Sequence, residues 1–209
     1  MGYKFDESSL TSEKSLWNIY IQSRKISGSK FQNLLIFSVI TILSLNAFYL
    51  ESDISVLLGN VRKWADIGFN FSITTLGFLI AGFTIFATLS KPDMMLAMME
   101  HIHKETQLPT LKYNFFVFMR VFIFYIFFSI LYLFIILFGQ SDGAISNLFE
   151  LISELDLLKI IIVKLSYVIV GTSFIYLVLL LKGFVFNIYA IVMNFLRWEY
   201  HVNSSSKGD

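Results

Sequence analysis

Residues 67–90 read IGFNFSITTLGFLIAGFTIFATLS and contain no charged side chain. A helix of this length crosses the roughly 30 Å of hydrocarbon in a bilayer, where a central charge would cost about 2.5–3.5 kcal/mol. Residues 31–50 and 121–141 are uncharged as well. The stretch 67–90 therefore predicts a membrane-spanning helix, and the two other uncharged stretches predict further spans.

The overall composition agrees with a membrane protein. Of the 209 residues, 56% are hydrophobic and 15% are charged, whereas a soluble domain carries about a quarter charged residues. The formal net charge of +1 provides no broad basic field, so we expect no direct binding to nucleic acid. The chain has no cysteine, which excludes disulfides and thiolate metal sites.

The sequence predicts an all-α, polytopic membrane protein with four transmembrane helices and short amphipathic helices at both membrane surfaces. Four spans are expected at about residues 31–50, 67–90, 119–140 and 163–182, followed by a helical extension over 183–198. A fifth span at 183–196 remains an alternative. The spans and the extension form a membrane domain over 31–198, between an N-terminal arm (1–30) and a C-terminal tail (199–209).

The distribution of Lys and Arg predicts the orientation of the spans. The arm, the loop 91–112 and the C-terminal end from Arg197 onward together carry ten of these residues, and the other two loops carry three. Because basic residues are retained on the cytoplasmic side, both termini and the loop 91–112 are expected in the cytoplasm. Five side chains are expected to act as anchors at the membrane interface: Trp17, Arg120, Lys164, Lys182 and Trp198.

The cytoplasmic loop contains a methionine-rich segment. Pro92 and Asp93 mark a helix start, and one apolar face follows at helical spacing: Met94, Met95, Met98, Met99 and Ile102. A flexible thioether surface can accept a protein partner. The alternative is that this face lies on the membrane or packs beneath the chain's own helices. His101 and His103 are two residues apart, so they point in different directions and cannot chelate one metal together.

The loop on the other side of the membrane predicts a second surface helix. Ile145, Leu148, Phe149, Ile152 and Leu155 share one face, opposite serine and glutamate residues. An acidic polar face disfavours contact with anionic headgroups. A lid, a contact between subunits, or packing on the membrane surface are the interpretations that remain.

The span 67–90 is rich in small residues. Gly68, Thr75 and Gly82 recur every seven residues, with Gly77 and Ala81 among them. Small residues let helix backbones approach closely in lipid, so we expect these five to mediate helix packing or oligomerisation. The alternative is a pore-lining helix, with Asn70, Ser72, Thr74 and Thr75 facing water.

The spans offer no catalytic chemistry. They contain no Asp or Glu, although ion-coupled transport usually needs an intramembrane carboxylate. The sequence contains no phosphate-binding loop, nucleophile elbow or zinc-binding His-Glu-x-x-His motif. We therefore expect no enzyme activity, no catalytic residues, no cofactor and no bound metal.

The plan of a basic arm, four spans and a Met-rich loop, together with the stretch GFLIAGFTIFATL at 77–89, resembles the small tetraspan proteins of bacterial defence islands. The resemblance is most specific to the KwaA family of the Kiwa anti-phage system. It implies a homo-oligomeric sensor, most simply a tetramer, in the bacterial inner membrane and in contact with membrane lipids. It also implies a cytosolic, DNA-binding effector of the KwaB kind as partner, and restraint of phage replication as the outcome.

Two other functions fit the residues. An oligomeric ion channel or pore subunit would use the polar flank of the second span. A lipid- or quinone-binding accessory subunit would use the aromatic residues of the third span.

Overall fold

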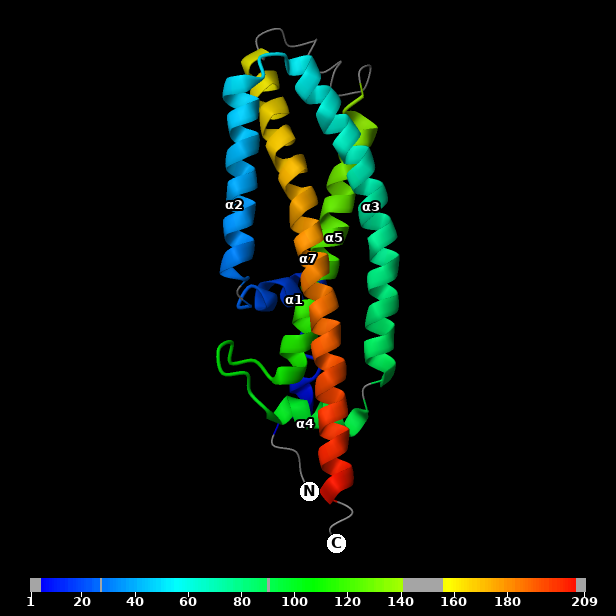
Figure 1. The fold of residues 1–209 in the computed structure, drawn as a ribbon. Helices are drawn as coiled ribbons and strands as arrows, with labels where there is room; N and C mark the ends of the chain where they lie inside the picture. Colours follow the sequence, from blue (N-terminus) through cyan, green and yellow to red (C-terminus); the bar gives the residue numbers. More distant parts are fainter. Residues whose placement is uncertain (1–4, 27, 90, 141–155, 206–209) are drawn as a thin grey trace. The chain divides into compact units, whose positions relative to one another are not determined.

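The computed structural model describes residues 5–26, 28–89, 91–140 and 156–205, and its regular structure is helical. The elements follow one another along the chain as Figure 1 shows: η1 (Glu7–Ser9), α1 (Leu16–Ser23), α2 (Lys30–Leu45), η2 (Asn46–Leu50), α3 (Ile54–Leu89), α4 (Pro92–Glu100), α5 (Thr110–Phe138) and α7 (Asp156–Ser205). Within these ranges there is no β-strand, and the one extended pairing is an isolated bridge between Ile102 and Pro109.

Four helices are long and apolar enough to cross a membrane, which confirms the predicted fold class of an all-α, four-span protein. They comprise Lys30–Leu50, Ile54–Thr88, Thr110–Phe138 and Leu157–Ser204. The second expected surface helix, at residues 145–155, lies outside the described residues. The surface segments that the charge pattern places on the cytoplasmic side form two short helices, α1 and α4.

Three of these helices are longer than the spans expected from the charge pattern. α3 begins at Ile54 rather than near residue 67, and α5 begins at Thr110 rather than near residue 119. α7 has 50 residues, which corresponds to about 75 Å of helix. Charged residues limit how much of a helix can lie in hydrocarbon, but they do not stop the helix, so the uncharged stretch is shorter than the element. At Gly183, α7 continues without a break.

The chain divides into two compact units, which are described separately. Unit 1 comprises residues 1–27, 77–123 and 180–209, and unit 2 comprises residues 28–76 and 124–179. The helices α3, α5 and α7 contribute residues to both units.

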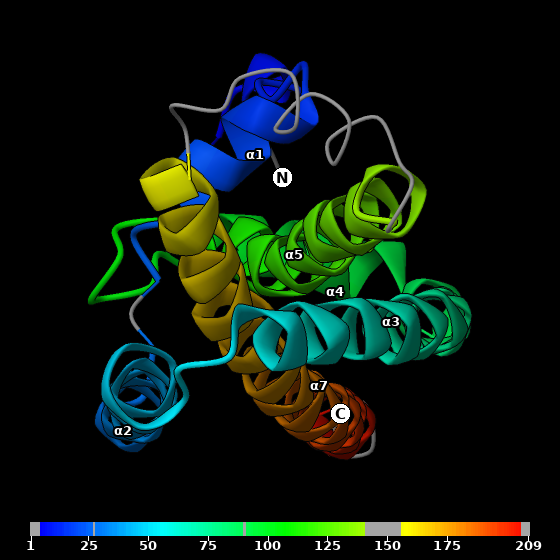
Figure 2. The same cartoon turned by 90° about the horizontal axis from the view of Figure 1, so that it is seen from above.

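In unit 2, α2 lies outside the other helices and packs along α7 (Figures 1 and 2). Only 6% of the most apolar part of α2 is buried within the chain. Close packing is possible because Gly171 of α7 has no side chain: a Cβ there would lie 2.7 Å from Leu43 and 3.0 Å from Trp64. A π-helical turn, η2, ends the same span, and its Asn46 amide donates to the Tyr167 hydroxyl at 2.8 Å.

In unit 1, aromatic rings fill the space between the helices. Phe83 and Phe86 of α3, Phe118 of α5 and Phe184 of α7 make edge-to-face or tilted contacts, with ring centroids 5.2–6.1 Å apart. Such geometries stabilise aromatic pairs beyond the area that they bury. A second cluster joins Ile26 of the N-terminal arm to Leu108 and to Phe116 of α5.

Candidate functional site

The small residues that recur every seven positions on α3 pack against helices of the same chain. Gly68 and Thr75 are buried in unit 2, and a Cβ on Gly68 would lie 2.8 Å from the ring of Tyr132 on α5. That ring is fully buried, and its hydroxyl lies 2.7 Å from Ser173 Oγ. Since Ser173 donates to the Val170 carbonyl, the Tyr132 hydroxyl donates to Ser173. These small residues are therefore packing positions within one chain.

Gly82 has the same role in unit 1. A Cβ at this position would lie 3.0 Å from Ile188 Cδ1 and 3.2 Å from Phe184 Cε1, both on α7. The contact surface of Gly82 is consequently occupied by the chain's own helix and is not available to a second copy.

A different face of α3 remains uncovered in unit 1. Gly77 and Ala81 are exposed, and so are Thr84 and Thr88 further along the helix. Their spacing of four, three and four residues places all of them on one side of α3. No atom lies within 4 Å of a Cβ built on Gly77. We call Gly77, Ala81, Thr84 and Thr88 the small-residue stripe.

The methionine-rich helix α4 is only partly a surface. Met94 and Met99 are buried, with 5% and 2% of their area exposed. These two side chains form part of the core of unit 1, in keeping with the alternative that this face packs beneath the chain's own helices. Met95 and Met98 are half-buried, and Ile102 is 45% exposed. These last three residues form the methionine surface that a partner could reach.

α4 is held against the C-terminal part of α7. Lys91, immediately before the helix, donates to both carboxylate oxygens of Glu199 at 2.8 and 2.9 Å. Beneath α4 lies a cavity of about 460 Å³, lined by Met94 and Met98 and by Asn194 and Trp198 of α7. The position of the methionine surface thus depends on how α4 packs on α7.

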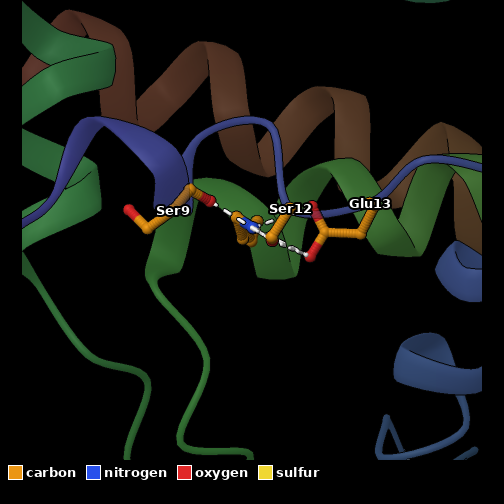
Figure 3. A network of polar contacts seen from close by, with 4 residues as sticks. Ser9, Ser12 and Glu13 are labelled. Carbon is orange, nitrogen blue, oxygen red and sulfur yellow. Dashed lines mark hydrogen bonds and ion pairs between the residues drawn. The ribbon is translucent and has the colours of Figure 1, made fainter.

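The N-terminal arm is attached to α5 by a partly buried ion pair (Figure 3). Lys112 Nζ donates to both oxygens of Glu13 at 2.8 and 2.7 Å and to Ser12 Oγ at 2.6 Å. Ser12 in turn donates to Glu13 at 2.8 Å and to the Ser9 carbonyl at 3.4 Å. Burial raises the pKa of the Glu13 carboxyl, but the hydrogen bonds from Lys112 and Ser12 and the charge of Lys112 outweigh it. The net pKa of Glu13 lies below its ordinary value.

Arg120 provides a second attachment of the same arm. Its Nη1 donates to the Ile26 carbonyl at 2.6 Å, next to the cluster of Ile26, Leu108 and Phe116. The charge pattern predicted an interface anchor at Arg120 and contained no indication of this bond, because its two ends are 94 residues apart in sequence.

The other expected interface anchors lie in varied surroundings. Trp17 is 67% exposed on α1, where its ring lies 5.4 Å from that of Tyr20. Lys182 is exposed and Trp198 is half-buried. In unit 2, the Lys164 ammonium lies 5.3 Å from the centre of the Phe48 ring, a cation–π contact.

His103, in the loop after α4, packs against an aromatic side chain of unit 1. His103 stacks on Tyr113, with ring centroids 4.2 Å apart and planes 4° from parallel. In the described part of the chain, no group of three or more His, Asp and Glu side chains could hold a metal ion. Sequence periodicity could not reveal the stacking, because the two rings are brought together by the turn between α4 and α5.

Comparison with known proteins adds no relative from which a role could be transferred. No protein-family model, curated protein or solved structure matches the chain.

Proposed function

We propose that this protein is a non-enzymatic, homo-oligomeric sensor or scaffold of the bacterial inner membrane. It assembles through the small-residue stripe of α3 and presents the methionine surface to a cytosolic effector. The resemblance to the KwaA family supports anti-phage defence as the process and an effector of the KwaB kind as the partner. Both termini and α4 face the cytoplasm in this proposal, in keeping with the distribution of Lys and Arg.

The exposed stripe is the observation that carries the proposal. In lipid there is no hydrophobic gain from burying an apolar helix face, so helices associate where small residues allow close backbone contact. Gly77 and Ala81 provide that close approach. Thr84 and Thr88 donate to carbonyls of their own helix at 2.9 Å, so their hydroxyls need no partner and can be packed between helices at little cost.

Signal transfer follows from the packing of α4. A perturbation of the envelope changes the tilt or packing of the spans and shifts the population of subunit arrangements. α4 is joined to α7 through Lys91 and Glu199, so a movement of α7 moves the methionine surface. The effector is then held or released according to which arrangement is populated.

The oligomerisation step is tested by native mass spectrometry of the purified protein. Gly77→Leu with Ala81→Leu places two bulky side chains on the stripe and should convert the assembly to monomers. Gly183→Leu is the matched control, because Gly183 is exposed in unit 1 and a Cβ there meets nothing within 4 Å. Monomeric wild type, or an unchanged assembly in the double variant, would refute assembly through this face.

The docking step is tested by purifying the protein together with the product of the neighbouring gene, which is the candidate effector. Met95→Asp with Met98→Asp should abolish co-purification of the effector and leave the oligomer intact, since both residues are partly exposed. Met95→Leu with Met98→Leu preserves an apolar surface and should retain the effector. Capture at wild-type levels by the aspartate variant would place the docking surface elsewhere.

The same stripe favours one alternative function. Thr84 and Thr88 are polar and exposed, so an assembly that turned them toward its axis would form an ion channel or pore. Ion flux through liposomes that contain the protein separates the two functions. A flux that Thr84→Val alters would favour the channel. No flux for any ion or voltage tested would favour the scaffold.

A further inference from the structure

The cavity of about 460 Å³ beneath α4 is walled by α4, α5 and α7, and all of its lining residues belong to unit 1. Its volume is within the range of ligand pockets in proteins. On α7 the lining residues are Ile191, Asn194 and Trp198, whose spacing places them on one side of the helix. Three lining residues, Ala97, His101 and Asn194, are exposed. The cavity is therefore open to a ligand from outside.

The lining of the cavity carries no carboxylate, ammonium or guanidinium group. None of its eleven residues is Asp, Glu, Lys or Arg, and an imidazole is mostly neutral above pH 7. Charged residues occur on the same helices, such as Glu100 on α4 and Arg197 on α7, but they lie outside the lining. Moving a charged group from water into such a site without a counterion is costly. The lining therefore favours an uncharged ligand.

Three polar side chains in the lining have no hydrogen-bond partner among the described residues. These are the carboxamides of Asn114 on α5 and Asn194 on α7 and the indole N–H of Trp198. Asn114 and Trp198 are half-buried. A carboxamide both donates and accepts hydrogen bonds, and a peptide group does the same. The polar part of the lining therefore matches a ligand that contains amide groups.

The remaining part of the wall is apolar and aromatic. Met94 and Ile191 are buried, with 5% and 7% of their area exposed, and the lining also includes Met98 and the rings of Tyr113 and Trp198. Thioethers make favourable contacts with aromatic rings, and aromatic rings do so with one another. An aromatic side chain is therefore the apolar group that this wall suits best.

The cavity is continuous with the methionine surface, because Met98 belongs to both. A partner that covers the methionine surface therefore reaches the opening of the cavity. Protein interfaces commonly have an aromatic anchor that fills a pocket near their centre. The effector of the proposed function is accordingly the source of such an anchor.

We propose that the cavity binds an uncharged peptide segment of the effector, with an aromatic side chain against Met98 and Trp198 and with peptide groups at Asn114 and Asn194. The source of the segment rests on the proposed function, whereas the chemistry of the cavity does not. A charged segment would lose hydration without gaining a counterion. A pure hydrocarbon would leave the carboxamides and the indole N–H without partners.

Saturation-transfer NMR with the purified protein tests the cavity in the absence of the effector. N-acetylphenylalanine amide has an aromatic side chain between two uncharged amide groups and should bind with a Kd of about 1 mM, as expected for a ligand of this size. N-acetylphenylalanine carries a carboxylate and N-acetylglycine amide lacks the ring, so each should bind about tenfold more weakly or less. No binding of the first probe, or equal binding of all three, would overturn the proposal.

Two variants locate the probe in the cavity. Asn194→Leu keeps the approximate shape of the side chain but removes its hydrogen bonds, and it should weaken binding of N-acetylphenylalanine amide about tenfold. Asn187→Leu is the matched control, because Asn187 lies on the same helix and outside the lining. Ala97→Phe places a ring at an exposed position of the lining and should abolish binding. If Asn194→Leu and Ala97→Phe both bind the probe as the wild type does, the site is elsewhere.

Co-purification with the product of the neighbouring gene separates this inference from the proposed function. Asn194→Leu and Ala97→Phe should each lower capture of the effector about tenfold or more, and Asn187→Leu should not. A wild type that captures the effector, with capture unchanged in Asn194→Leu and Ala97→Phe, would overturn this inference and leave the proposed function intact. A wild type that binds the probe but captures no effector would refute the proposed function and the effector as the source of the segment.

Discussion

Replacing Gly68 by alanine tests the helix packing of unit 2 with a single methyl group. The new Cβ would lie 2.8 Å from Tyr132 Cε2 and Cζ and 3.1 Å from Cδ2. The clash is with the body of a rigid ring, and the ring is fully buried with its hydroxyl bonded to Ser173. Tyr132 must therefore shift or α3 must move away from α5.

The expected loss of stability combines three contributions. Overpacking a core costs about 1–3 kcal/mol, and a Tyr132–Ser173 hydrogen bond lost through the shift costs about 0.5–1.5 kcal/mol. Alanine favours the helix over glycine by about 1 kcal/mol, which offsets part of this loss. Gly68→Ala should therefore lower the free energy of unfolding by about 1–3 kcal/mol.

Gly59 supplies the matched control on the same helix and in the same unit. No atom lies within 4 Å of a Cβ at Gly59, so Gly59→Ala keeps only the helix-propensity gain and should stabilise by about 0.5–1 kcal/mol. Unfolding in mixed micelles, followed by tryptophan fluorescence, measures both variants. In a double-mutant cycle, Tyr132→Leu should reduce the cost of Gly68→Ala, because the ring that the methyl group strikes is gone. Equal effects at Gly68 and Gly59, or additivity with Tyr132→Leu, would refute the close approach of α3 and α5.

Three further predictions concern unit 1. Gly82→Leu should destabilise the chain by about 1–3 kcal/mol, measured in the same micelle assay, because the added side chain meets Phe184. The Glu13 pKa is lowered by folding, so the ion pair contributes its full stability above the ordinary carboxyl pKa and loses it as the pH falls through the depressed value. In the Lys112→Gln variant, the melting temperature should therefore depend less on pH in the acidic range. A melting temperature that falls equally in the wild type and the variant from neutral to acidic pH would contradict the pairing. Lys91→Ala should change stability by less than about 1 kcal/mol, because the Lys91 side chain is 52% exposed.

The fold could be predicted from sequence because the controlling interaction is local. A run of uncharged residues long enough to cross hydrocarbon has few alternatives to a helix, since every backbone polar group must be satisfied internally. The ends of the helices could not be predicted in the same way. Outside hydrocarbon, residues such as Arg62 and Lys63 are compatible with a helix, so α3 extends through them to Ile54.

The faces of α3 show a second limit of sequence analysis. Small residues occur on both sides of this helix, and periodicity alone does not tell which side its neighbours cover. The structure assigns Gly68 and Gly82 to contacts within the chain because Tyr132 and Phe184 lie opposite them. Gly77 and Ala81 remain exposed. The sequence contains small residues on both faces, but the aromatic residues of the other helices determine which face is covered and which is exposed.

Long-range polar contacts attach the surface segments of unit 1 to its long helices. Lys112 and Arg120 of α5 both bind the N-terminal arm, through Glu13 and the Ile26 carbonyl. Lys91 joins the start of α4 to Glu199 of α7. These bonds connect α5 to the arm and α7 to α4. A movement of α5 or α7 must therefore displace the attached surface segment or break a charged contact. A charge-assisted bond of this kind is worth about 1.5–3 kcal/mol where it is buried and less where it is exposed. The partly buried pair of Glu13 and Lys112 should therefore hold the arm more firmly than the more exposed pair of Lys91 and Glu199 holds α4, so α4 is the segment that is more easily released.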